Sequence, residues 1–199
     1  MADLTVFNSK EEYESLAERK TGSEEVFSGH LLHVYSDDVT LPDGAPSKRE
    51  LIRHLGAVAI LPLTDDGYVY MERQFRYPLD AVITEVPAGK LNTKTEDRLE
   101  AAKRELQEET GLTADEWTNL GDFHPSAAYT DERLTLYLAR GLHEGAQKLD
   151  DDEFLNVYKV PFATVLDEVL AGKITDAKTQ IIILKAAAVI GEFRRKGTV

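Results

Sequence analysis

The pattern of apolar and polar residues predicts strands over most of the first half of the chain. Residues 55–63, LGAVAILPL, are almost all apolar, which indicates a strand buried on both faces. Before it, residues 24–41 alternate well enough for two strands and residues 47–54 for a third, which suggests an antiparallel sheet. Further strands are expected at residues 68–75, 81–86, 119–123, 133–140 and 154–160.

Helices are expected where apolar residues recur at steps of three and four. Leu99, Ala102 and Leu106 follow this rule, in a helix that Gly111 would end and that a capping box at 93–96, or Thr95 instead, would begin. Other helices are predicted at residues 9–20, 162–171 and 176–195. This mixed order of strands and helices favours an α/β fold, with a sheet covered by helices on both sides.

Composition and charge narrow the class of protein. The 199 residues are 42% hydrophobic and 30% charged, as in an ordinary soluble protein with a substantial core. The net charge of −13 argues against binding to nucleic acid or to an anionic membrane, because both need a basic patch. The absence of cysteine excludes disulfides and fits a cytoplasmic protein. No signal peptide or membrane-spanning run is evident.

Glutamates crowd one side of the helix that ends at Gly111. Glu105, Glu108 and Glu109 are three or four residues apart or adjacent, and like charges so placed repel each other. One interpretation is a solvated face on which Arg104 pairs with the glutamates. The other is a site for a divalent cation, since carboxylate oxygens suit Mg²⁺. Spacing alone does not decide between the two.

The surrounding residues favour the cation site. Gly89, Glu96 and the run from Arg104 to Leu112, RELQEETGL, resemble the Nudix box of the Nudix hydrolases, G-x5-E-x7-R-E-U-x-E-E-x-G-U with U aliphatic. Every specified residue is present, but residues 90–95 make the first loop one residue longer than the pattern. The resemblance implies a Nudix-type α/β/α sandwich with a mixed sheet, preceded here by a small N-terminal antiparallel sheet.

Flanking motifs resemble the ADP-ribose pyrophosphatase branch of this family. They are HLGAV from His54, QFRYP from Gln74, EVPAG from Glu85, S-x-x-YTDE from Ser126, D-x-EF from Asp151 and KI-x-DAKT from Lys173. The branch implies Mg²⁺-dependent hydrolysis of ADP-ribose, a small-molecule nucleoside diphosphate sugar, to AMP and ribose 5-phosphate. Ala127-Ala128 departs from the Pro-Gly that the branch commonly has, and bears on the sugar preference.

The resemblance also implies a metal site. The backbone carbonyl of Ala88, Glu105 and Glu109 would hold two or three Mg²⁺ ions, with Mn²⁺ able to substitute. Glu108 would be a further ligand or support, and Arg104 would orient the carboxylates.

The general base of the branch lies outside the box, in a loop between the last strands. Glu153 takes its place here, as catalytic base or metal-linked glutamate, with Asp151 as the alternative. A solvated acidic loop is the structural alternative.

Three further residues are candidates for substrate binding. Arg76 would bind a phosphate, because a guanidinium does so bidentately, unless it is a surface residue at a strand end. Glu85 would hydrogen-bond the ribose or adenine, or serve the fold alone. Arg53 would contact a phosphate or a partner subunit. The five histidines show no pairing and are interpreted as structural.

We expect three regions: an appendage with a short helix at residues 1–23, a β-sheet region at 24–54 that forms a homodimer, and the hydrolase domain at 55–199. Other substrates remain open, namely ADP-glucose, GDP-mannose or a nucleoside triphosphate. A non-catalytic module that senses ADP-ribose is the alternative to an enzyme, although such modules would be expected to lose box glutamates.

Overall fold

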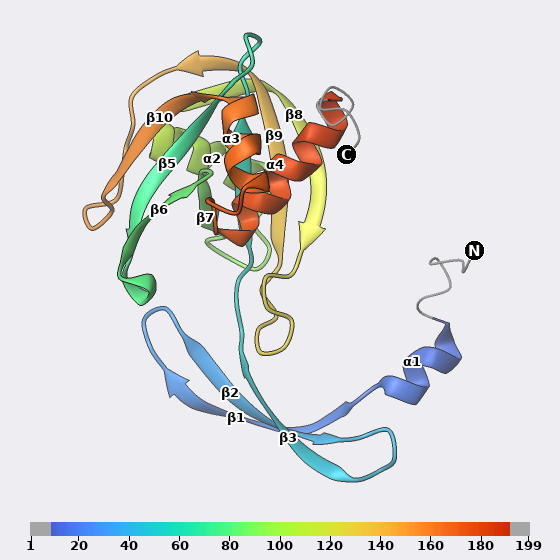
Figure 1. Cartoon of the computed structure of the whole chain (residues 1–199). Helices are drawn as coiled ribbons and strands as arrows, with labels where there is room; N and C mark the ends of the chain where they lie inside the picture. Colours follow the sequence, from blue (N-terminus) through green and yellow to red (C-terminus); the bar gives the residue numbers. More distant parts are fainter. Residues whose placement is uncertain (1–8, 192–199) are drawn as a thin grey trace. The chain divides into compact units, whose positions relative to one another are not determined.

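A computed structural model describes residues 9–191 of the chain, coloured along the sequence in Figure 1. The chain divides into two compact units. One comprises Met1–His54 with Ser126–Asp131, and the other Leu55–Pro125 with Glu132–Val199. In the described part of the chain no helix is long and apolar enough to cross a membrane.

The N-terminal unit is a short helix followed by an antiparallel sheet in the order β1-β2-β3. Its elements are α1 at Lys10–Leu16, β1 at Arg19–Ser28, β2 at His33–Thr40 and β3 at Pro46–Ile52. Ser9 caps α1 as expected, but the helix ends four residues before the predicted Lys20. The reason is that Arg19 already pairs with Thr40, so β1 begins within the region expected to be an appendage.

The second unit holds two sheets, one of four strands in the order β7-β4-β9-β8 and one of three in the order β10-β5-β6. Its strands are β4 at Ala57–Pro62, β5 at Tyr68–Arg76, β6 at Ala81–Glu85, β7 at Ala88–Lys90, β8 at Leu112–Phe123, β9 at Leu134–Glu144 and β10 at Leu155–Pro161. A 3-10 turn at Tyr77–Leu79 joins β5 to β6. Because β4 pairs parallel with β9 and antiparallel with β7, the four-stranded sheet is mixed, as predicted.

Helices cover both faces of the sheets (Figure 1). They are α2 at Arg98–Thr110, α3 at Phe162–Leu170 and α4 at Ala177–Ile190. Alternation along β4 separates two cores: Val58 and Ile60 pack with α2, whereas Ala59 and Leu61 pack with α3 and α4. An apolar run buried on both faces therefore fits the observed sandwich, and the predicted α/β fold is confirmed.

Two boundaries in the second unit differ clearly from those predicted, and the predicted end of a third element lies outside the described residues. Asp97, not Thr93 or Thr95, caps α2, because its carboxylate accepts the N–H groups of Leu99 and Glu100. β8 starts at Leu112 instead of 119, since its pairing with β9 runs from there despite weak alternation. α4 ends at Ile190, where Gly191 has φ 79°; the predicted end at 195 lies outside the described residues.

Candidate active site

The box arginine holds the glutamates of α2. Arg104 Nη1 donates to Glu105 Oε1 at 2.7 Å and to Glu108 Oε2 at 2.9 Å. The second contact follows from the four-residue spacing, which places two side chains on one helix face. The structure therefore puts Arg104 where an orienting role requires it.

The loop at residues 90–95, one residue longer than the family pattern, is tied to the same arginine. Arg104 Nη2 donates to the Lys90 carbonyl at 3.2 Å and approaches Glu96 Oε1 at 3.4 Å. The Glu96 carboxylate in turn accepts the N–H of Asn92. These contacts fix both ends of the loop to α2, so the extra residue leaves Glu96 and Arg104 together.

Strand β7 packs directly on the acidic face of α2. A Cβ atom at Gly89 would lie 2.0 Å from the carboxyl carbon of Glu105, so no larger residue fits without moving that side chain. One residue earlier, the N–H of Ala88 donates to Glu109 Oε2 at 2.8 Å. Ala88, Glu105 and Glu109, three predicted metal ligands, are thus brought together.

These carboxylates are buried and close to one another. Burial raises the pKa of Glu109, and the charges of Glu72, Glu105 and Glu153 raise it further. Burial also raises the pKa of Glu105, although Arg104 opposes this effect. The pKa of half-buried Glu153 is raised by burial and by Asp150. The structure therefore brings the predicted base Glu153 close enough to the acids of α2 to act on their ionisation.

Sequence reasoning missed Glu72. This residue lies on β5 opposite Glu85 of β6, is only 3% exposed, and has no hydrogen-bond partner for Oε1 among the described residues. Burial and then the charges of Glu153 and Glu85 raise its pKa. The available signal was a glutamate next to the buried pair Val69 and Met71, but a single acid in a strand has no periodic pattern to identify it.

Arg76 and Glu85, two predicted substrate residues, bind each other. Arg76 Nε donates to Glu85 Oε1 at 2.7 Å and its Nη2 to Oε2 at 2.9 Å. Lys178 of α4 also donates to Glu85 Oε2, and lies 3.1 Å from Asp176. Both oxygens of the buried Glu85 carboxylate are therefore occupied by cations, which positions Arg76 instead of leaving Glu85 free for a ligand.

Arg53 belongs to the N-terminal unit, and its contacts lie there. It donates to both carboxylate oxygens of Asp37, at 3.1 and 3.0 Å, and to Ser23 at 3.2 Å. Its guanidinium also stacks on Tyr35, 3.9 Å from the ring centroid. Within this unit Arg53 therefore has a structural role.

The donor set fits a divalent cation. Carboxylates outnumber cations here. Arg104 is shared by Glu96, Glu105 and Glu108, and neither Glu72 nor Glu109 forms an ion pair within the described chain. Such buried oxygen ligands are what Mg²⁺ binds. Over residues 9–191 no three acidic or histidine side chains are arranged around one point.

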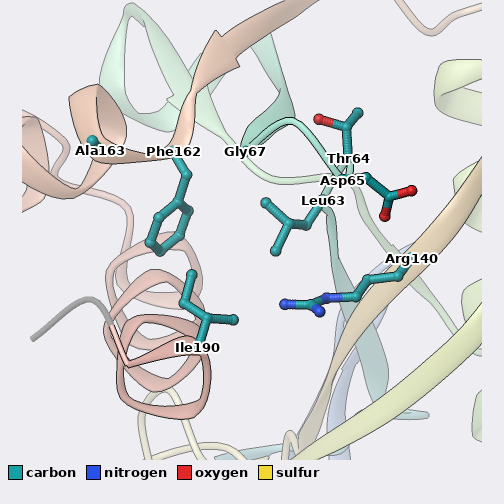
Figure 2. A pocket seen from close by; sticks show the side chains of 8 residues that line it. All are labelled: Leu63, Thr64, Asp65, Gly67, Arg140, Phe162, Ala163 and Ile190. Atoms are coloured by element: carbon teal, nitrogen blue, oxygen red, sulfur yellow. The ribbon is translucent and has the colours of Figure 1, made fainter.

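A separate cavity of about 390 Å³ lies in the second unit, which also holds α2, and none of the predicted site residues line it (Figure 2). Its lining residues are Leu63, Thr64, Asp65, Gly67, Arg140, Phe162, Ala163 and Ile190. Arg140 points into it, with Nε lacking a hydrogen-bond partner. Its lining brings only Asp65 as an acid, so it does not offer the carboxylates that diphosphate chemistry needs.

The family is established by comparison with known proteins. The NUDIX domain model matches residues 53–181, which include β4, β7, α2 and the Glu153 loop. The chain therefore belongs to the Nudix family and is a Nudix hydrolase, which confirms the identification made from the box.

Among individual proteins, the ADP-ribose pyrophosphatase of Bacillus subtilis (strain 168) is 43% identical over 171 residues, covering 85% of this chain and 92% of that protein. The methanol dehydrogenase activator of Bacillus methanolicus is 42% identical, covering 84% and 92%. A crystal structure of an ADP compounds hydrolase matches with a TM-score of 0.76 at 22% identity, over 93% of this chain and 99% of that one. That likeness supports the fold.

Proposed function

We propose that this protein hydrolyses the diphosphate bond of ADP-ribose, with Mg²⁺, to AMP and ribose 5-phosphate. The observation that carries the proposal is the complete box, in which Arg104 and the N–H of Ala88 gather carboxylates that outnumber the cations beside them. The name and 43% identity of the Bacillus subtilis relative support ADP-ribose as the substrate.

Glu105, Glu109 and the Ala88 carbonyl would hold two or three Mg²⁺ ions, with Glu108 as a further ligand and Mn²⁺ as a substitute. When bound, the ions neutralise the diphosphate charge and favour attack by water. Arg104 keeps Glu105 and Glu108 oriented. The excess of acids over cations supports this assignment.

Glu153 takes the proton from the attacking water. Burial and the neighbouring Asp150 raise the pKa of Glu153, which makes it a stronger base than an exposed carboxylate. Asp151 is the alternative base in the same loop. Glu153 also lies close enough to Glu109 to raise the pKa of that side chain, which supports a place at the reacting centre.

Arg76 binds a phosphate of the substrate. Its guanidinium is oriented by Glu85, whose second oxygen also accepts from Lys178, and it remains partly exposed. Glu85 thus acts on the substrate through Arg76. A direct contact from Glu85 to the ribose would require it to leave one of these cations.

The protein forms a homodimer through its N-terminal sheet. It works in the cytoplasm. Exposed apolar side chains on and beside β1 support an interface with a second copy: Val26, Phe27, Leu31 and Leu32. Arg53, bonded to Asp37, would stiffen this sheet.

A binding role is the second candidate, because the relative from Bacillus methanolicus bears the name of an activator at 42% identity. One experiment separates the two. The protein is incubated with Mg²⁺ and ADP-ribose, ADP-glucose, GDP-mannose or ATP, and the products are separated by chromatography. We expect AMP and ribose 5-phosphate from ADP-ribose, abolished in Glu109→Gln and retained in the exposed control Glu116→Gln. Tight binding of ADP-ribose without turnover of any compound would favour the sensor instead.

A further inference from the structure

The proposed chemistry leaves one buried carboxylate without a role. Glu72 of β5 is 3% exposed, and Oε1 meets no donor in the described chain. Leaving a buried polar group unsatisfied costs about 1–3 kcal/mol, and more for a charged one. Folding alone therefore gives no reason for an acid at this position.

The nearby cations give no reason for an acid at this position either. Arg76 and Lys178 both donate to Glu85, the residue directly opposite Glu72 on β6. Two glutamates opposite each other repel, and the bonds to Arg76 and Lys178 relieve the charge of Glu85. Of these two glutamates, only Glu72 thus has a carboxylate oxygen without a hydrogen-bond partner among the described residues.

Its other neighbours are the acids of the candidate metal site. After burial, the charge of Glu72 is the largest influence raising the pKa of Glu109, and Glu153 is the largest charge raising that of Glu72. Glu72 therefore lies beside Glu109 and the Glu153 loop, on a strand that holds it rigidly between β6 and β10. An unpartnered carboxylate oxygen among further carboxylates takes either a proton, as the raised pKa of Glu72 indicates, or a hard cation, for which such oxygens are suitable ligands.

We propose that Glu72 is a further carboxylate ligand of the divalent-cation site, acting beside Glu109. This inference rests on the proposed function only for the existence of that site. It adds a residue outside the box, from the three-stranded sheet, so that β5 as well as α2 and β7 would position the ion.

The test is a Mn²⁺ titration of the full-length, metal-free protein, read by calorimetry and by the electron paramagnetic resonance of free Mn²⁺. Wild type is compared with Glu72→Gln, Glu72→Asp and the exposed control Glu116→Gln. We expect both Glu72 variants to raise the Kd for Mn²⁺ about 10- to 100-fold, the range found when partners that orient metal ligands are removed. Glu116→Gln should match wild type.

Glu72→Asp is the decisive variant, because it keeps the charge and withdraws the carboxylate by one methylene. An Asp variant with wild-type affinity would show that Glu72 acts only through its long-range field, and would overturn the proposal. So would an unchanged Kd in Glu72→Gln. If Glu72→Gln fails to fold, Glu72→Asp decides alone. Absence of ADP-ribose turnover by wild type that still binds Mn²⁺ would instead refute the proposed function.

Discussion

Replacement of Gly89 by alanine should separate the stability of the fold from the geometry of the site. The added Cβ would lie 2.0 Å from the Glu105 carboxyl carbon and 2.2 Å from each of its oxygens, so the carboxylate must move. Gly89 does not have a positive φ, and therefore the substitution strains no backbone. The displaced group is the end of a side chain, which limits the loss in free energy of unfolding.

The loss of stability can be bounded from the contact that breaks. The bond from Arg104 to Glu105 is charge-assisted, of a kind worth about 1.5–3 kcal/mol. The Arg104 side chain is 28% exposed and keeps Glu108, so about 1 kcal/mol is expected. A misplacement of about 1 Å in a catalytic group lowers rates about 100-fold. Activity on ADP-ribose should therefore fall at least that far.

A matched control is Gly172→Ala. Gly172 has φ 70° with open space around its Cβ position, so alanine there loses about 1–2 kcal/mol by backbone strain alone. Thermal unfolding and steady-state rates of both variants are the measurements. We expect the two variants to have similar melting temperatures and only Gly89→Ala to lose activity. Wild-type activity in Gly89→Ala would refute the view that β7 places Glu105.

Three further predictions concern stability and assembly. Burial raises the folded-state pKa of Glu109, Glu105 and Glu72 above about 4.3, the value in the unfolded chain. Above that pH the native state binds more protons than the unfolded state, so the free energy of unfolding falls as pH rises. Melting temperature without metal should therefore decline from pH 5 to 8, less in Glu109→Gln; a flat profile in wild type would contradict this. Leu106→Ala, at a fully buried position in the α2 core, should lower the free energy of unfolding by about 2–5 kcal/mol in urea titrations. Phe27→Asp, at a 55% exposed site, should yield monomers by light scattering with an unchanged far-UV spectrum, and a persistent dimer would exclude β1 from the interface.

The acidic face of α2 could be predicted because it is local. Glu105, Glu108 and Glu109 share a face by helical spacing, and Gly111 ends the helix in the left-handed conformation expected of it. β4 was equally clear, since an apolar run needs burial on both sides. These features depend on residues close in sequence.

Features that depend on distant partners were missed or misplaced. Glu72 becomes significant only in the folded chain, where it lies opposite Glu85 and its charge raises the pKa of Glu109, and no pattern within β5 reveals this. The bond from Arg76 to Glu85 joins side chains of two strands, and the early start of β1 depends on its pairing with Thr40 of β2. The cap of α2 was misplaced because Thr95 and Asp97 are both good caps, and it is the Asp97 carboxylate that accepts the N–H groups of Leu99 and Glu100.

The most direct test of the central claim is phosphorus NMR of ADP-ribose incubated with the protein and Mg²⁺. Hydrolysis between the two phosphorus atoms predicts loss of the diphosphate resonances and growth of two phosphomonoester resonances, one from AMP and one from ribose 5-phosphate. Glu109→Gln should leave the diphosphate intact over the same period. Diphosphate resonances that persist with wild-type protein, at saturating Mg²⁺, would contradict the account.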